Sequence, residues 1–182
     1  MQPARRLLQT LEQLATPEQC LFTPNDLRAA LPELSDTAFK TVLSRLSKQH
    51  YLTRICRGIY LFEKAYVNDG RLLFYVAARL RANDFSYISL ETALSDAGVI
   101  SQIPINTITL LTSGRSNIIH CGRWGKIEFI HTRLRAEDLV DQIFYDDQCK
   151  LWRASVAQAL RDMRNTRRST DLIDWDVAHE LI

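Results

Sequence analysis

Two short helical segments joined by a linker of three residues constrain the fold of residues 22–62. Thr23, followed by a proline, is a typical start for the first helix, and Pro32 ends it. Ser35 is then placed to cap a second helix over residues 35–49. Because the linker is so short, the two helices must cross steeply, which is the arrangement of a helix-turn-helix.

The second helix has two faces of opposite character. Its apolar side chains recur at the i, i+3, i+4 and i+7 spacing of a buried face: Phe39, Val42, Leu43 and Leu46. The opposite stripe carries hydroxyls and cations and no carboxylate: Thr37, Lys40, Thr41, Ser44 and Lys48, with Arg45 beside it. Asp36 lies in the first turn, where the helix dipole favours a negative charge. We therefore expect an apolar side toward the protein and a cationic side turned outward.

Two β-prone runs follow this helix, at residues 52–55 and 59–62. Arg57 and Gly58 separate them, and glycine supplies a positive φ if the turn requires one. Helix, turn, helix and a two-stranded hairpin together predict a winged helix-turn-helix, with Arg54 and Arg57 on the wing.

This pattern predicts binding to double-stranded DNA, with the second helix in the major groove. Its three cations would meet phosphates or guanine edges, its three hydroxyls would make short polar contacts, and the two wing arginines would reach the adjacent backbone or minor groove. Two other interpretations stay open: an ordinary solvated surface, or a winged helix that binds protein. The predicted contact residues are Thr37, Lys40, Thr41, Ser44, Arg45, Lys48, Arg54 and Arg57.

The charge of the chain supports nucleic-acid binding only through its distribution. The net charge is +2, but residues 1–65 hold nine Lys and Arg against six Asp and Glu. This excess is small, so affinity for phosphates must come from local placement of the cations and should be sensitive to salt.

The sequence lacks the signals of an enzyme, a metal site or a membrane protein. Phosphate loops, dinucleotide fingerprints and nucleophile elbows are missing, so we expect neither catalysis nor a cofactor. The four cysteines are scattered singly, without the close pairs of a zinc site. No apolar run approaches the roughly 20 residues needed to cross a membrane, and no signal-peptide core follows the basic start. We expect a cytoplasmic protein.

A polar stretch with an Asn-Asp-Gly turn signal places a domain boundary after residue 65. The expected fold class is α+β, with the winged helix-turn-helix at residues 1–65 and an α+β effector domain at residues 66–182. Helices are predicted at residues 71–82, from Ser89 to Gly98, and at residues 151–164.

Three strands are predicted in the second domain, at residues 107–112, 117–121 and 126–132, after a loop that contains Pro104. They suggest a small antiparallel meander with helices on one face. His120 and His131 would then face each other across the meander.

Three stretches together resemble the AbiEi family, the antitoxins of bacterial type IV toxin–antitoxin and abortive-infection (phage-defence) systems. The first is Arg-Gly-Ile-Tyr at residues 57–60. The second is Tyr-Ile-Ser-Leu-Glu-Thr-Ala-Leu at residues 87–94, followed by Gly-Val-Ile and Pro104. The third is Ile-Thr-Leu-Leu-Thr-Ser-Gly-Arg-Ser at residues 108–116, followed by Gly-Lys-Ile-Glu-Phe-Ile-His at residues 125–131.

The resemblance implies a two-domain transcriptional autorepressor and antitoxin. Its winged helix would bind inverted repeats in its own promoter, with the stripe of the second helix as the recognition surface and Arg57 on the wing. Its C-terminal domain would counter a co-transcribed nucleotidyltransferase-like toxin.

Three alternatives remain at the level of sequence. The first is a winged-helix transcriptional regulator with a different effector domain and no toxin partner. The second is a protein-interaction module that uses the acidic segment at residues 137–147. The third is an enzyme working at the Ser-Gly-Arg-Ser turn of residues 113–116. The arginines at residues 161–168 either complement a helix dipole or make a second nucleic-acid contact.

Overall fold

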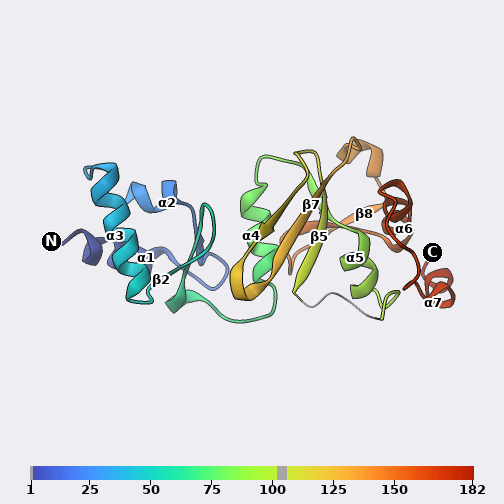
Figure 1. The fold of residues 1–182 in the computed structure, drawn as a ribbon, viewed down its shortest axis with the longest axis horizontal. Coiled ribbons are helices and arrows are strands. Elements are labelled where there is room, and N and C mark those ends of the chain that lie inside the picture. Colours follow the sequence, from blue (N-terminus) through green and yellow to red (C-terminus); the bar gives the residue numbers. More distant parts are fainter. Residues whose placement is uncertain (1, 102–105) are drawn as a thin grey trace. The chain divides into compact units, whose positions relative to one another are not determined.

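The computed structural model describes residues 2–101 and 106–182, so the predicted loop position of Pro104 lies outside the described residues. The chain divides into two compact units, Met1–Gly70 and Arg71–Ile182, whereas the sequence placed the boundary after residue 65. The described residues form seven α-helices and two β-sheets, so the fold is α+β (Figure 1). No helix in these ranges is both long and apolar enough to cross a membrane.

Unit 1 contains three helices and a three-stranded antiparallel sheet with the strand order β1-β3-β2. A short 3-10 turn, Glu63–Ala65, follows the sheet. The elements are α1 (Pro3–Leu14), β1 (Leu21–Phe22), α2 (Pro24–Ala29), α3 (Asp36–Lys48), β2 (Leu52–Cys56) and β3 (Ile59–Phe62).

The predicted starts of α2 and α3 are confirmed by their caps, whereas α2 ends at Ala29, before the proline at which the sequence placed its end. The Thr23 hydroxyl accepts a hydrogen bond from the Asp26 amide at 3.2 Å, and the Asp26 carboxylate accepts one from the Thr23 amide at 2.7 Å. The Ser35 hydroxyl accepts from the Ala38 amide at 3.3 Å and caps α3. Gly58 turns the β2–β3 hairpin with φ +86°, a conformation that costs glycine little.

The core of unit 1 is the layer between α3 and the elements that pack on it. Leu46 is fully buried and Phe39 and Leu43 nearly so, together with Leu7 and Leu11 of α1. Burying a leucine or phenylalanine contributes about 1.5–3 kcal/mol, so this face holds α3 firmly in place. The same burial leaves the opposite face of α3 to solvent.

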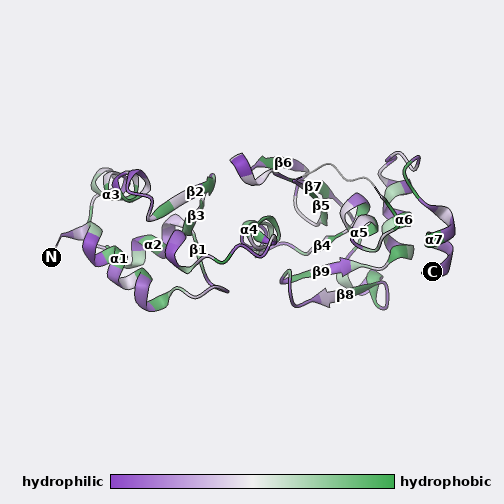
Figure 2. Ribbon diagram, turned by 90° about the horizontal axis from the view of Figure 1, so that it is seen from below, coloured by the Kyte–Doolittle hydropathy of each residue, from purple (hydrophilic) through white to green (hydrophobic). Residues whose placement is uncertain are grey.

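Unit 2 is built on one six-stranded mixed sheet with the order β6-β7-β5-β4-β9-β8, which can be followed from top to bottom in Figure 2. The elements are α4 (Leu72–Leu80), β4 (Ser86–Ile88), α5 (Leu90–Asp96), β5 (Thr107–Thr112), β6 (Asn117–His120), β7 (Lys126–His131), β8 (Ile143–Asp146), β9 (Leu151–Ala154), α6 (Val156–Asn165) and α7 (Trp175–Glu180).

The predicted antiparallel meander is wrong, although its three strands lie close to where the sequence placed them. β5 pairs with β7 in parallel, and β6 lies outside β7 at the edge of the sheet. Arg81 stabilises this return of the chain, because its guanidinium donates to the Arg115 carbonyl and the Asn117 amide oxygen, each at 2.9 Å. His120 therefore pairs in register with Lys126, and His131 does not face it.

The predicted helix at residues 151–164 is also wrong in its first turn. Residues 151–154 form β9, which pairs with β4 in parallel and with β8 in antiparallel orientation. The helix starts only at Val156, where the Ser155 hydroxyl accepts from the Gln158 amide at 3.2 Å. Side chains alternate along β9: Leu151 is buried and Trp152 is 41% exposed.

Helices cover both faces of the sheet, not one face as the sequence suggested (Figure 2). On one face, the Arg81 guanidinium, just after α4, lies 4.6 Å from the centre of the Phe129 ring in β7. On the other face, the Thr109 amide of β5 donates to the Thr92 hydroxyl of α5 at 2.8 Å. Unit 2 is thus a three-layer structure with its sheet in the middle.

A buried carboxylate ties α6 to the central strand β4. Asp162 is 2% exposed and accepts hydrogen bonds from Tyr87 Oη at 3.1 Å, Ser89 Oγ at 2.7 Å and Gln158 Nε2 at 2.9 Å. The predicted cap of α5 is therefore only partly correct: Ser89 occupies the N-cap position, but its hydroxyl serves Asp162. Burial raises the pKa of Asp162, and its three hydrogen bonds oppose that rise only in part.

This raised pKa predicts how the stability of unit 2 depends on pH. A carboxyl whose folded pKa lies above its unfolded value, about 4, contributes most at low pH and loses that contribution as the pH rises through the folded pKa. Asp162→Asn cannot ionise at this position. We therefore expect its free energy of unfolding to rise relative to that of the wild type as the pH increases from about 4 to about 8. Denaturant titrations followed by tryptophan fluorescence measure this, because all three tryptophans lie in unit 2.

Asp147→Asn, the same substitution at an exposed position of unit 2, is the matched control with which the pH dependence of Asp162→Asn is compared. A constant difference between Asp162→Asn and wild type would contradict the assignment.

Candidate nucleic-acid interface

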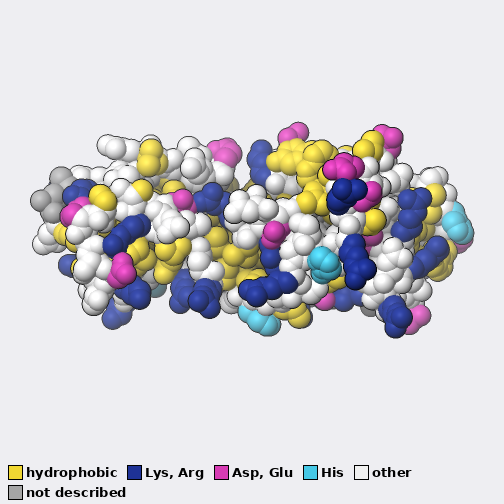
Figure 3. Space-filling view, turned by 90° about the horizontal axis from the view of Figure 1, so that it is seen from above, with side chains coloured by type: hydrophobic (Ala, Val, Ile, Leu, Met, Phe, Trp, Pro, Cys, Tyr) yellow, Lys and Arg dark blue, Asp and Glu magenta, His cyan; other side chains and the backbone are white. Residues whose placement is uncertain are grey.

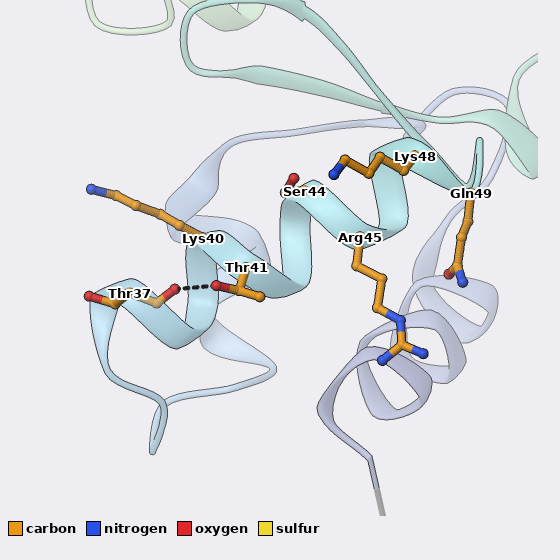
Figure 4. A pocket seen from close by; sticks show the side chains of 7 residues that line it. All are labelled: Thr37, Lys40, Thr41, Ser44, Arg45, Lys48 and Gln49. Atoms are coloured by element: carbon orange, nitrogen blue, oxygen red, sulfur yellow. Dashed lines mark hydrogen bonds between the residues drawn. The ribbon is translucent and has the colours of Figure 1, made fainter.

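The residues predicted to contact DNA all lie on the surface of unit 1. Each of the eight is exposed: Thr37, Lys40, Thr41, Ser44, Arg45, Lys48, Arg54 and Arg57. The six on α3 line a shallow hollow along the outward side of the helix, together with Gln49 (Figure 4). We call these seven residues of α3 and its C-cap the α3 surface.

The α3 surface is polar but partly pre-organised. The Thr41 hydroxyl donates to the Thr37 carbonyl at 2.9 Å, so it can still accept a hydrogen bond from a ligand. The side chains of Thr37 and Ser44 are short, which allows a partner to approach the helix backbone closely.

The cations of this interface carry no counter-charge of their own. Within residues 2–101 and 106–182, no carboxylate lies within ion-pair distance of the three α3 cations or the two wing arginines. Lys and Arg side chains occur over both units on the face drawn in Figure 3, interspersed with carboxylates. The α3 surface is therefore distinguished by cations that lack an ion-pair partner among the described residues, and not by the overall number of charges.

The cations on α3 point in two directions. In Figure 4, Lys40, Ser44 and Lys48 leave one side of the helix, whereas Arg45 and Gln49 extend toward α1. Arg45 and Gln49 also line a second recess, which α1 shares through Gln2, Ala4, Arg5 and Leu8. The sequence placed Arg45 beside the stripe but gave no indication that it would meet α1.

The hairpin after α3 places its two arginines differently. Arg54 is in β2, where it pairs in register with Tyr60 of β3, and a β-bulge follows it before Cys56. Arg57 lies in the turn itself, next to Gly58. A bulge increases the local twist of a strand, so the tip of the hairpin and Arg54 need not face the same way.

The sequence analysis missed one residue that orders this surface. Arg28 of α2 donates from Nη2 to the Leu34 carbonyl at 2.6 Å and lies 3.2 Å from a carboxylate oxygen of Asp36. Its guanidinium also lies over the Phe39 ring, 5.0 Å from the ring centre. Arg28 thus fixes the turn before α3 and neutralises Asp36, the acidic residue in the first turn of α3. An arginine at the end of one helix with an aspartate at the start of the next is the signal that could have found it.

The other sequence-derived candidates have structural contacts. In the turn at residues 113–116, the Ser113 hydroxyl accepts from the Phe85 amide at 3.0 Å and the Ser116 hydroxyl from the His131 amide at 2.8 Å. Arg168, from the arginine-rich segment, forms ion pairs with Glu91 and Glu128. The four cysteines are buried, and the described residues contain no cluster of three potential metal ligands.

Comparison with known proteins shows a similarity of fold. No protein-family model matches the chain, and no curated protein matches it. Among solved structures it is similar to the RV2827C protein from Mycobacterium tuberculosis, with a TM-score of 0.53 and 17% sequence identity. The match covers 76% of this chain and 47% of that protein, so this chain spans less than half of its length. At this identity the similarity concerns the fold alone.

The contacts of Arg28 predict a loss of order in α3 when they are removed. Arg28→Ala should raise amide hydrogen exchange in the first turns of α3, because the turn loses two hydrogen bonds, an ion pair and a cation–π contact, together worth about 1–2 kcal/mol. Hydrogen exchange followed by mass spectrometry on peptides from residues 36–48 measures this. Arg57→Ala removes the same charge from a position without an ion pair among the described residues and should leave these peptides unchanged. Equal exchange in the two variants would contradict the role of Arg28.

Proposed function

We propose that unit 1 is a winged helix-turn-helix that binds double-stranded DNA with α3 in the major groove. The observation that carries this proposal is the two-sided character of α3: one side is buried in the core, and the other presents hydroxyls and cations that have no ion-pair partner among residues 2–101 and 106–182. A helix of 13 residues is about 20 Å long, and the B-DNA major groove is about 12 Å wide, so the helix fits with its exposed side inward.

The arrangement of charge suits a phosphate backbone better than a protein partner. The first turn of α3 holds an aspartate, but Arg28 pairs with it, which leaves the α3 surface without an unneutralised acid. Unpaired lysine and arginine side chains are what a phosphate backbone attracts, and short hydroxyl side chains suit contacts at base edges. Arg54 and Arg57 add two exposed cations on the hairpin that follows α3, where a wing would contact the flanking backbone.

We further propose that the chain is a transcriptional autorepressor and antitoxin of the AbiEi type. Support comes from the sequence resemblance, which covers segments of both units, and from the division into two units. Unit 1 would bind inverted repeats in its own promoter, with two copies spaced by the helical repeat of DNA. Unit 2 would counter a nucleotidyltransferase-like toxin encoded beside it.

The DNA-binding proposal predicts a defined change when cations are removed from the α3 surface. Lys40→Ala/Lys48→Ala should weaken binding to the DNA directly upstream of the chain's own reading frame. It should also lower the slope of log K against log salt by about one for each phosphate that the variant no longer neutralises. Fluorescence anisotropy from about 50 to about 300 mM salt, the range over which such slopes are steep, measures both quantities.

Arg133→Ala/Arg164→Ala is the matched control, because it removes two exposed cations from unit 2. Failure of the wild type to bind any duplex at low salt would refute DNA binding. Tight binding that the Lys40/Lys48 substitutions leave intact would refute the assignment of α3.

The antitoxin proposal predicts that unit 2 is required for protection. If the neighbouring gene is toxic when expressed alone, co-expression of the full chain should restore growth, and a chain that ends at residue 70 should not. Colony counts measure this, and immunoblots check that the truncated chain accumulates. Equal protection by the truncated chain would assign protection to unit 1, and no protection by the full chain would remove the antitoxin role.

A further inference from the structure

A recess lies between α1 and the C-terminal end of α3, beside the α3 surface. Its volume is about 410 Å³, and Arg45 and Gln49 line both the recess and the α3 surface. Most of its polar lining comes from two helices that are distant in sequence: Gln2 and Arg5 from the start of α1, and Arg45 and Gln49 from the end of α3. Tyr51, from the segment after α3, also lines it. Leu8 and Leu46 contribute to its apolar wall. We call this the α1–α3 recess.

The charge in the α1–α3 recess is of one sign. In the part of the chain that the structure describes, its two charged side chains both end in guanidinium groups, and no carboxylate lines it. Among the described residues, neither Arg5 nor Arg45 has an ion-pair partner. Arg6, the next residue along α1, does pair, with Glu33 on the α2–α3 linker. The first turn of α1 contains no acidic residue that would neutralise the recess.

Two guanidinium groups that share a recess repel each other. An anion between them attracts both and so offsets that repulsion. Guanidinium groups are planar donors that match the oxygens of a phosphate, often through two parallel hydrogen bonds. The side-chain amides of Gln2 and Gln49 can donate as well. The apolar wall formed by Leu8 and Leu46 suits a sugar ring, which a free inorganic anion lacks.

We propose that the α1–α3 recess holds a phosphate of the DNA backbone, beside the major groove that α3 enters. The inference rests on the proposed function, because the recess is continuous with the α3 surface through Arg45 and Gln49. Arg45 then contacts the DNA backbone together with Arg5, and Lys40, Thr41 and Ser44 remain for the major groove. Figure 4 shows Lys40 and Ser44 on a different side of α3 from Arg45. Arg5 and Arg45 are then positioning residues that set the register of α3 on the duplex.

A phosphate contact carries no sequence information, and this property gives the test. Arg5→Ala should weaken binding to the upstream DNA and to an unrelated duplex of equal length by the same factor, about tenfold. The salt slope should fall by about one. Arg5→Lys keeps the charge but loses the planar fork, so its affinity should lie between those of the wild type and Arg5→Ala. Arg5 is exposed, and a thermal melt of each variant checks that unit 1 is intact.

A second probe locates the phosphate directly. In a series of duplexes, each phosphate in turn is replaced by an uncharged methylphosphonate. At one backbone position per bound copy, the wild type should lose more affinity than Arg5→Ala, which keeps only Arg45 in the recess. Arg164→Ala, which removes one exposed cation from unit 2, should follow the wild type at every position.

The outcomes separate this inference from the proposed function. No binding of any duplex by the wild type would refute both. Wild-type binding that Arg5→Ala leaves unchanged would refute the recess alone, and so would a larger loss on the upstream DNA than on the unrelated duplex, because that indicates a contact to a base. Equal sensitivity of wild type and Arg5→Ala to every methylphosphonate would also overturn it.

Discussion

Burial of one side of α3 is the constraint on which unit 1 depends. Phe39, Leu43 and Leu46 insert into a core that α1 and the β2–β3 hairpin complete, so the helix cannot rotate without exposing them. This fixes which side chains face outward, and it brings the end of α3 beside the start of α1. The position of every cation on this surface follows from that apolar packing, because none of them is held by an ion pair within the described residues.

Local signals predicted most elements of unit 1 and the positions of β5, β6 and β7 in unit 2, but not how the strands of that sheet pair. Caps such as Thr23 and Ser35, and the hairpin turn at Gly58, act within a few residues and can be read directly from the sequence. Strand pairing in unit 2 depends on partners far apart in the chain. β4 has only three residues, and the sequence around Trp152 fits a helical spacing as well as a strand, so neither strand was recognised.

The candidate site was predicted as a set of residues but not as an arrangement. The exposed stripe of α3 follows from its periodicity alone. The direction of Arg45 depends on how α1 crosses α3, and the role of Arg28 depends on the turn between two helices, so neither follows from the spacing of residues. Ser89 shows the same limit in unit 2: as a cap residue it looked local, but its hydroxyl serves a carboxylate on α6.

The order in which the sheet of unit 2 is assembled differs from the order of the chain. β4, near the start of the unit, has β5 on one side and β9 on the other, and β9 ends at Ala154. During synthesis on the ribosome, β4 therefore lacks one neighbour until about three quarters of the unit has emerged. Unit 1 takes all its strands and α-helices from the first 62 residues, so it can reach its final fold while that sheet is still incomplete.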